Sequence, residues 1–228
     1  VTLAVHLLGA GGIAMPSVSQ ILMSLVVMTL PPCETSSAGS RAISTRRLCA
    51  VGGSLALALT MLLATALIPV KQCQRWQAAG DLLWMAQSNY SGAEAAFGAA
   101  CQADVWAAEP WRRRAELTYR GAQANHFQSN DSFESAVQFL QESIHRDPFN
   151  FNGPRTMAGW WLERWRVTKE ARDAIESVTW IQRANQLYPT NASILAEVAI
   201  AQDAAGLNAA DYARLALKQD RLNRERGH

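Results

Sequence analysis

The sequence predicts an all-α chain in two parts. Two transmembrane helices are expected in residues 1–70, and a degenerate, water-soluble solenoid of helical hairpins in residues 71–228. Residues 48–70 carry no charge, and small and bulky side chains recur at helical spacing in the second part. No stretch alternates apolar and polar residues around a hairpin turn, so we expect no strands.

The uncharged run 51–70 marks the second predicted span, which we take as residues 48–70. Arg46 and Arg47 precede this span and Lys71 follows it. A helix needs about 20 mostly apolar residues to cross the hydrocarbon core of a bilayer. The run has that length, so we expect it to span a membrane.

The first predicted span covers residues 1–30, which contain no Asp, Glu, Lys or Arg. Glycine and proline interrupt the run, and a kink or break is expected between Gly11 and Pro16 because proline removes a helix donor. The pattern allows two structures for this segment. It is either a half-helix over 1–8 followed by a main span over 17–30, or a single kinked helix.

A polar loop over residues 31–47 joins the two predicted spans. The loop holds three arginines and a single acid, Glu34. The positive-inside rule then favours a cytoplasmic loop and an external C-terminal part. We therefore expect a protein of the bacterial inner membrane with a periplasmic C-terminal domain. The chain starts at Val1 within an apolar run, and we expect that the parent protein begins upstream.

The charge distribution argues against nucleic acid as a partner. The formal net charge of +2 arises entirely before Lys71, and the remaining 18 basic and 18 acidic residues cancel. Nucleic-acid binding needs a clustered basic surface. The four cysteines show no CxxC pairing and no histidines at ligand spacing, so we predict no metal site.

A small residue, a bulky one four positions later and a small one three positions after that recur in the second part. Residues at i, i+4 and i+7 share one helix face, so small side chains there let a neighbouring helix approach closely. In the second and third copies a proline, Pro148 or Pro189, follows. The four copies are Ala93, Phe97 and Ala100; Ala136, Leu140 and Ser143; Ser177, Ile181 and Ala184; and Ala209, Ala213 and Ala216.

This pattern resembles the second helix of the tetratricopeptide repeat (TPR), which carries an A-x₃-F…P signature. The resemblance implies stacked helix pairs that offer a surface to a protein partner. The spacing between copies is irregular, so the repeats are degenerate. An irregular helical bundle with alanine-rich seams is the alternative.

Two side-chain clusters are candidate binding sites. The first is Trp111, Arg112, Arg113 and Arg114, at a helix start, where arginines are unfavourable unless they meet an anion or carboxylates. The anion could be a lipid phosphate or pyrophosphate. The alternative, which we favour, is a solvated face neutralised by Glu109 and Glu116.

The second cluster is Trp160, Trp161, Arg164 and Trp165. Aromatic and guanidinium groups on one face could bind a glycan or a peptide by stacking and forked hydrogen bonds. Packing between repeat helices explains these tryptophans equally well.

The chain contains no motif for nucleophilic, phosphate-binding or metal-dependent chemistry, and we predict no catalytic residue and no cofactor. The histidines are scattered, and none has a partner at catalytic or ligand spacing.

Residues 6–30, HLLGAGGIAMPSVSQILMSLVVMTL, resemble the late transmembrane helix of bacterial O-antigen ligase/polymerase-type proteins. In that family a glycine-containing stretch and a Pro-x-Val step lead into an apolar helix, and some members end in a TPR-like tail. The family transfers or polymerises glycans from an undecaprenyl-pyrophosphate carrier, with catalytic arginines and a histidine on an upstream loop that no residue here matches.

The resemblance implies that this chain is the C-terminal, membrane-anchored repeat module of such a glycan enzyme, with protein or glycan contacts through the repeats. The alternative is a non-enzymatic, membrane-anchored TPR adaptor of the cell envelope. Further spans and a large His/Arg-containing loop upstream of Val1 would distinguish the first from the second.

Overall fold

The computed structural model describes residues 52–53, 57, 60 and 67–225. From residue 67 onward this part of the chain is entirely helices and short connections. In order these are α4 (Ile68–Asp81), the π-helical turn η2 (Leu82–Ala86), α5 (Tyr90–Ala103), α6 (Glu109–Ala124), α7 (Asn130–Arg146), α8 (Asn152–Thr168), α9 (Ala171–Leu187), α10 (Ala192–Ala204) and α11 (Ala210–Glu225).

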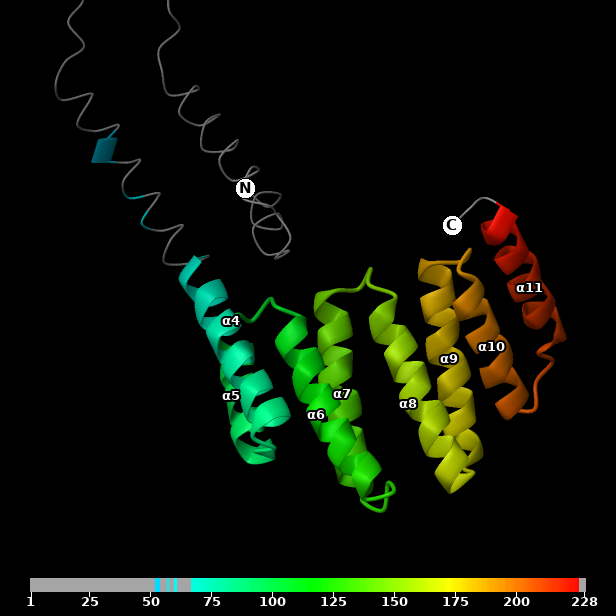
Figure 1. Cartoon of the computed structure of the whole chain (residues 1–228), viewed down its shortest axis with the longest axis horizontal. Helices are drawn as coiled ribbons and strands as arrows, with labels where there is room; N and C mark the ends of the chain where they lie inside the picture. Colours follow the sequence, from blue (N-terminus) through cyan, green and yellow to red (C-terminus); the bar gives the residue numbers. More distant parts are fainter. Residues whose placement is uncertain (1–51, 54–56, 58–59, 61–66, 226–228) are drawn as a thin grey trace, which may run out of the picture.

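The helices form four antiparallel pairs that stand side by side in a row (Figure 1). The pairs are α4–α5, α6–α7, α8–α9 and α10–α11. Connections within pairs lie at one edge of the row and connections between pairs at the other. The first helices of successive pairs, α4, α6, α8 and α10, therefore run in one direction.

No helix in the described part of the chain is both long and apolar enough to cross a membrane. The predicted fold class, two transmembrane helices followed by a solenoid, is corrected accordingly to an all-helical repeat fold. The helix that contains the end of the predicted second span, α4, has 14 residues and carries Lys71, Arg75 and Asp81. That is shorter and more polar than the roughly 20 apolar residues a span needs. The rest of the predicted spans 1–30 and 48–70 and of the loop 31–47 lies outside the described residues, except for positions 52–53, 57 and 60.

Local sequence explains where the helices begin and end. The Asn89 side chain accepts a hydrogen bond from the Gly92 N–H, and Asn191 accepts from Ser193 and Ile194, so α5 and α10 start at capped ends. Lys169 takes a left-handed conformation, with φ of 60°, and closes α8. Pro148 and Pro189 follow the ends of α7 and α9, where they prevent the helices from continuing.

The small–bulky–small positions lie on the inner faces of the second helices in the first three pairs. Every member of these three copies is buried. In the fourth pair Ala216 is buried, Ala209 is half-buried and Ala213 is exposed. Tyr212 of α11 contacts the core in place of Ala213, because α11 approaches α10 along a neighbouring face.

Apolar packing continues from one pair to the next. The largest core cluster joins α6, α7 and α8, and within it the ring of Tyr119 stacks on Trp160 with centroids 4.3 Å apart. Phe133 meets Trp161 edge to face at 4.8 Å. Each of the three core clusters contains side chains of two neighbouring pairs, so the pairs pack into one row rather than standing as four separate hairpins.

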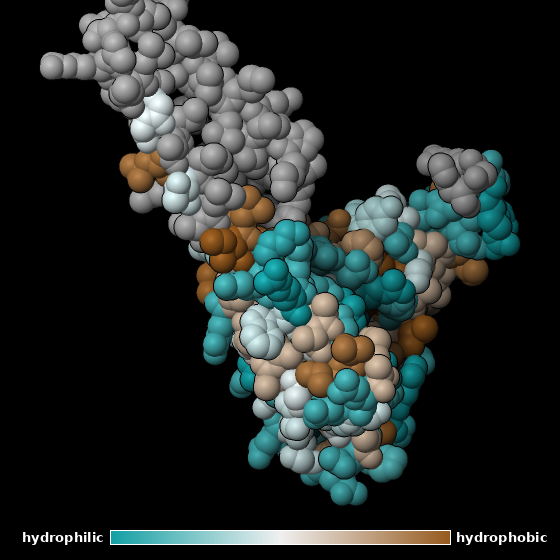
Figure 2. Space-filling view, turned by 60° about the vertical axis from the view of Figure 1, so that its left-hand side comes forward, coloured by the Kyte–Doolittle hydropathy of each residue, from teal (hydrophilic) through white to brown (hydrophobic). Residues whose placement is uncertain are grey.

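The first pair stands at the end of the described row. Figure 2 brings this pair forward and shows apolar residues among hydrophilic ones on its surface. The exposed large apolar side chains of α4 and η2 are Ile68, Val70, Trp76, Leu82 and Met85. They remain exposed because, among the described helices, α4 has neighbours on one side only.

Gly80 is required where α4 crosses α5. A Cβ atom at this position would lie 2.5 Å from the ring of Phe97, which is fully buried. We expect Gly80→Ala to lower the free energy of unfolding by about 1–3 kcal/mol, because overpacking outweighs the gain in helix propensity. Urea denaturation followed by circular dichroism measures the change.

Gly98→Ala is the matched control. Gly98 is also helical, but a Cβ there meets no atom within 4 Å. Its substitution should raise the free energy of unfolding by about 0.5–1 kcal/mol. Equal effects at the two glycines would rule out a tight crossing at Gly80.

Candidate interaction groove

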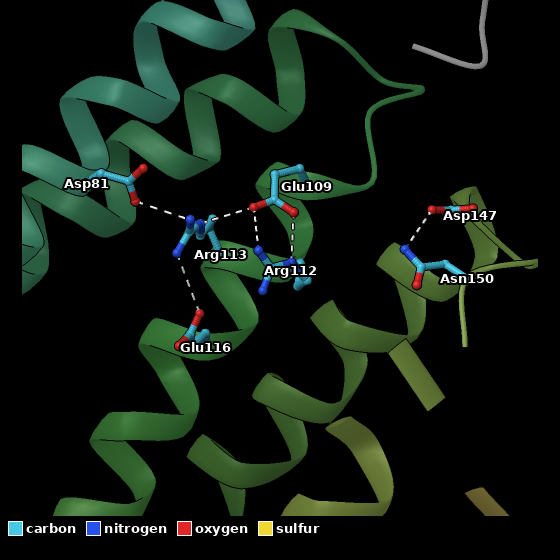
Figure 3. A network of polar contacts seen from close by, with 7 residues as sticks. All are labelled: Asp81, Glu109, Arg112, Arg113, Glu116, Asp147 and Asn150. Carbon is cyan, nitrogen blue, oxygen red and sulfur yellow. Dashed lines mark hydrogen bonds and ion pairs between the residues drawn. The ribbon is translucent and has the colours of Figure 1, made fainter. Parts of the chain in front are cut away.

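The three arginines of the first predicted cluster all have carboxylate partners, and Figure 3 shows those of Arg112 and Arg113. Arg112 donates to both oxygens of Glu109, with Nε–Oε2 and Nη2–Oε1 distances of 2.7 and 2.5 Å. Arg113 donates to Glu109 at 3.1 Å and lies 3.8 Å from Asp81 and from Glu116. The charges that the sequence places at the start of α6 are therefore compensated by carboxylates of this chain.

The remaining members of this cluster pack against neighbouring helices. Arg114 donates to Glu94 of α5 at 2.8 Å, and its guanidinium lies 4.0 Å from the centre of the Phe139 ring. Trp111 is covered by the guanidinium of Arg146, 4.5 Å from the ring centre. The cluster thus holds the first pair to the second, and the charges of its arginines are met by carboxylates of the chain itself.

The second predicted cluster lies mostly in the core. Trp160, Trp161 and Arg164 are buried, and Trp165 is half-buried with the Lys169 ammonium 4.6 Å from its ring. A ligand in solution cannot reach the first three. These residues share one face of α8, and that face packs against α6, α7 and α9 rather than facing solvent.

Arg164 forms a buried ion pair with Asp173 of α9. The Nε–Oδ2 distance is 3.4 Å, and the exposed fractions of the two side chains are 3% and 0%. Arg164 also donates to Asn130 at 2.9 Å, and Thr168 donates to Asp173 at 2.9 Å. Burial raises the pKa of the Asp173 carboxyl above its usual value, while the Thr168 bond and the Arg164 charge oppose that shift.

Polar contacts also connect the first helices of successive pairs. Arg113 of α6 reaches Asp81 of α4, as described above. Tyr119 and Gln123 of α6 donate to the two carboxylate oxygens of Glu163 in α8 at 2.6 and 2.5 Å. Burial, and then the bond to Glu163, raises the pKa of the Tyr119 hydroxyl, so it stays protonated and can donate. These contacts fix the distance between α6 and α8.

The next contact in this series joins α8 to α10. Arg155 donates to the carboxylate of Glu197, with an Nε–Oε2 distance of 2.9 Å, and to the Ser193 hydroxyl at 3.0 Å. This forked ion pair joins the beginning of α8 to the middle of α10. It holds the two helices in place beside the cavity described next.

A cavity of about 180 Å³ opens to solvent between α8 and α10, with α9 beneath it. Apolar atoms dominate the lining. Gly159 and Leu162 of α8 face Ile200 of α10, and Ile181 contributes to the floor. A Cβ at Gly159 would meet no atom within 4 Å, so the missing side chain leaves this space empty. We call this space the α8–α10 groove.

The residues of this groove form no recognisable motif in the sequence. Gly159 lies within α8 and Ile200 within α10, far apart in the sequence. The sequence signal that could have indicated the groove is a glycine, Gly159, and an apolar residue, Ile200, on outward-facing positions of two successive first helices. Only the placement of α10 beside α8 brings these residues together.

A larger cavity, of about 380 Å³, lies between the α9–α10 connection and α11. Neutral polar groups line it, including Asn191, Gln219 and Asn223. The Asn191 side-chain oxygen is already used as the cap of α10. This cavity therefore offers few free groups for recognition. Within the described residues no cluster of three or more His, Cys, Asp or Glu side chains is placed to hold a metal ion.

Comparison with known proteins bears on the fold. No family model matches the chain, and no curated protein sequence matches it. A crystal structure of MamA superposes with a TM-score of 0.52 at 11% sequence identity, and the match covers 82% of this chain and 99% of that one. This chain resembles MamA in fold. A second MamA crystal structure gives a TM-score of 0.37 at 14% identity, covering 68% of this chain and 95% of that one.

The likeness supports the TPR-like fold predicted from the repeat spacing. At this level of identity it concerns the fold alone. It gives no support to the predicted membrane, ligase or glycosyltransferase character. The resemblance of residues 6–30 to O-antigen ligase-type proteins and the predicted cellular location stay predictions, because that segment lies outside the described residues.

Proposed function

We propose that this chain is a non-enzymatic helical-repeat adaptor that binds a segment of a partner protein. The observation that carries the proposal is the α8–α10 groove, an apolar cavity open to solvent between two first helices. Stacked helical pairs present such surfaces along their length and support binding rather than chemistry.

The two predicted site clusters leave little unpaired positive charge for an anionic or glycan ligand in the described part of the chain. Arg112, Arg113 and Arg114 are bound to carboxylates of the chain itself. Arg164 is buried in the core. None of these cations is therefore free to bind a pyrophosphate-linked glycan, whereas the groove offers a concave apolar surface to a partner.

Site-specific photocrosslinking in the cells of origin tests this proposal. Benzoylphenylalanine replaces Leu162 in the groove of the full chain, or Thr179 on the exposed face of α9 as the control. We expect Leu162 to crosslink to one discrete protein and Thr179 not to. The crosslinked protein, purified separately, should bind the full chain in calorimetry.

Two results would contradict an adaptor role. One is the same crosslinking pattern at both positions, which indicates nonspecific proximity. The other is the failure of the purified components to bind, since an adaptor must hold its partner without other factors.

A further inference from the structure

Arg166 stands at the rim of the α8–α10 groove and is exposed. Within the described residues it forms no ion pair and no hydrogen bond, whereas Arg155 is held by Glu197 and Arg164 by Asp173. Arg166 is thus the arginine of α8 whose charge remains available to a carboxylate from outside the described structure.

The charge on the opposite side of the groove is already compensated. Glu197 accepts hydrogen bonds from Arg155 and, at 3.2 Å, from the Ser193 hydroxyl. The charged side chains that line the groove are Arg166 and Glu197, and because Glu197 is paired with Arg155 outside the lining, the uncompensated charge at the rim is that of Arg166. An incoming acidic group would therefore be attracted to the Arg166 side.

The cavity has the size and lining for one bulky apolar side chain. An apolar cavity of about 150 Å³ admits a benzene-sized ring, and this one is about 180 Å³. Ile200, which is 50% exposed, forms one wall and would be covered by such a side chain. Burial of apolar surface is the favourable term in such binding, and it is largest in a concave site.

We propose that the α8–α10 groove binds one bulky apolar side chain of a partner's peptide segment, and that Arg166 pairs with an Asp or Glu next to that side chain in the segment. The inference rests on the adaptor function proposed above and specifies the chemistry of the partner. An apolar anchor with an adjacent charged pair is a common basis of specificity at protein interfaces.

The test begins with selection of a phage-displayed library of random linear peptides on the full chain. We expect the selected peptides to share Leu, Ile, Met or Phe next to Asp or Glu. A synthetic peptide of the selected sequence is then titrated by fluorescence anisotropy against the wild type and two variants, Gly159→Leu and Arg166→Glu. Gly159→Leu fills the cavity and should weaken binding at least about tenfold, as expected for loss of an anchor pocket.

Arg166→Glu should also weaken binding about tenfold, because attraction becomes repulsion. A peptide in which the acidic residue is replaced by Lys should then bind Arg166→Glu more tightly than it binds the wild type. Gly98→Leu is the matched control, since Gly98 is a helical glycine with equally open space on α5. It should leave affinity unchanged, and circular dichroism should show that all variants are folded.

Three outcomes would overturn the inference. The library yields no binding peptides, the selected peptides lack the apolar–acidic pair, or Gly159→Leu binds them as well as Gly98→Leu does. If the selected peptides bind but ignore the groove variants, the adaptor function stands and this inference fails. Sedimentation velocity adds a fourth outcome, because a dimer of the full chain that Gly159→Leu dissociates would assign the groove to a second copy.

Discussion

Arg164→Met is expected to lower the free energy of unfolding by about 3–5 kcal/mol, because it leaves the Asp173 carboxylate buried without its charge partner. Asp173 is 0% exposed, and Arg164 is its ion-pair partner at 3.4 Å. The substitution also removes the bond to Asn130 and the stacking of the guanidinium over Phe133, 4.6 Å from the ring centre. Chemical denaturation at pH 7 measures the loss.

The loss should depend on pH in a definite direction. Burial raises the pKa of Asp173 in the folded state, and the Arg164 charge opposes that rise. Arg164→Met should therefore raise the pKa of Asp173 in the folded state further. A group whose pKa is higher in the folded state favours folding at low pH and loses that contribution as pH rises. The difference in stability between variant and wild type should therefore be smallest near pH 4, about the usual pKa of aspartate, and grow toward neutral pH.

Arg166→Met is the matched control for this prediction. It makes the same substitution two residues later in α8, at an exposed side chain, and should change stability by no more than about 0.5 kcal/mol. The double variant Arg164→Met/Asp173→Leu should recover most of the loss, because an apolar pair often replaces a buried ion pair without cost. A double variant that is as unstable as Arg164→Met would show that the pair is not the source of the effect.

Phe97→Ala is expected to lower the free energy of unfolding by about 3–5 kcal/mol. Phe97 is fully buried between α4 and α5, and its ring meets Trp84 edge to face with centroids 6.5 Å apart. Removal of the ring leaves a cavity that Gly80, directly opposite, cannot fill. Urea denaturation of the full chain gives the change.

Phe149→Ala tests whether that loss comes from burial rather than from the type of substitution. The Phe149 side chain is 86% exposed in the α7–α8 connection, so its truncation should change stability by no more than about 0.5 kcal/mol. Comparable losses at the two phenylalanines would contradict the packing of the first pair described here.

Much of the repeat domain was predictable because its signal is local. Small residues at i and i+7 around a bulky one define a helix face, and the face in α5, α7 and α9 is buried as its spacing predicts. The fourth copy differs, since Ala213 is exposed and Tyr212 contacts the core. Three alanines at this spacing do not specify which face of α11 meets α10, because no bulky side chain among them fixes the register.

The candidate sites were harder to predict because sequence spacing does not tell whether a face meets solvent or protein. Trp160, Trp161 and Arg164 share a face of α8, and a binding surface and a core seam give the same pattern. The partners that decide the matter, Asn130 and Asp173, come from α7 and α9. The transmembrane prediction depended on the length and composition of the uncharged runs, and no helix in the described part of the chain is long and apolar enough to match it.

The sequence alone determined the all-helical repeat character of residues 71–225, the positions of its helix-ending prolines, and most of its packing faces. These follow from periodicity and backbone chemistry within a few residues of each position. The tertiary structure alone decided that the arginines at the start of α6 meet carboxylates, that Arg164 lies in the core, and that Gly159, Ile200 and Arg166 surround one groove. Each of these depends on which helix stands beside which, and that is set by packing between pairs rather than by local sequence.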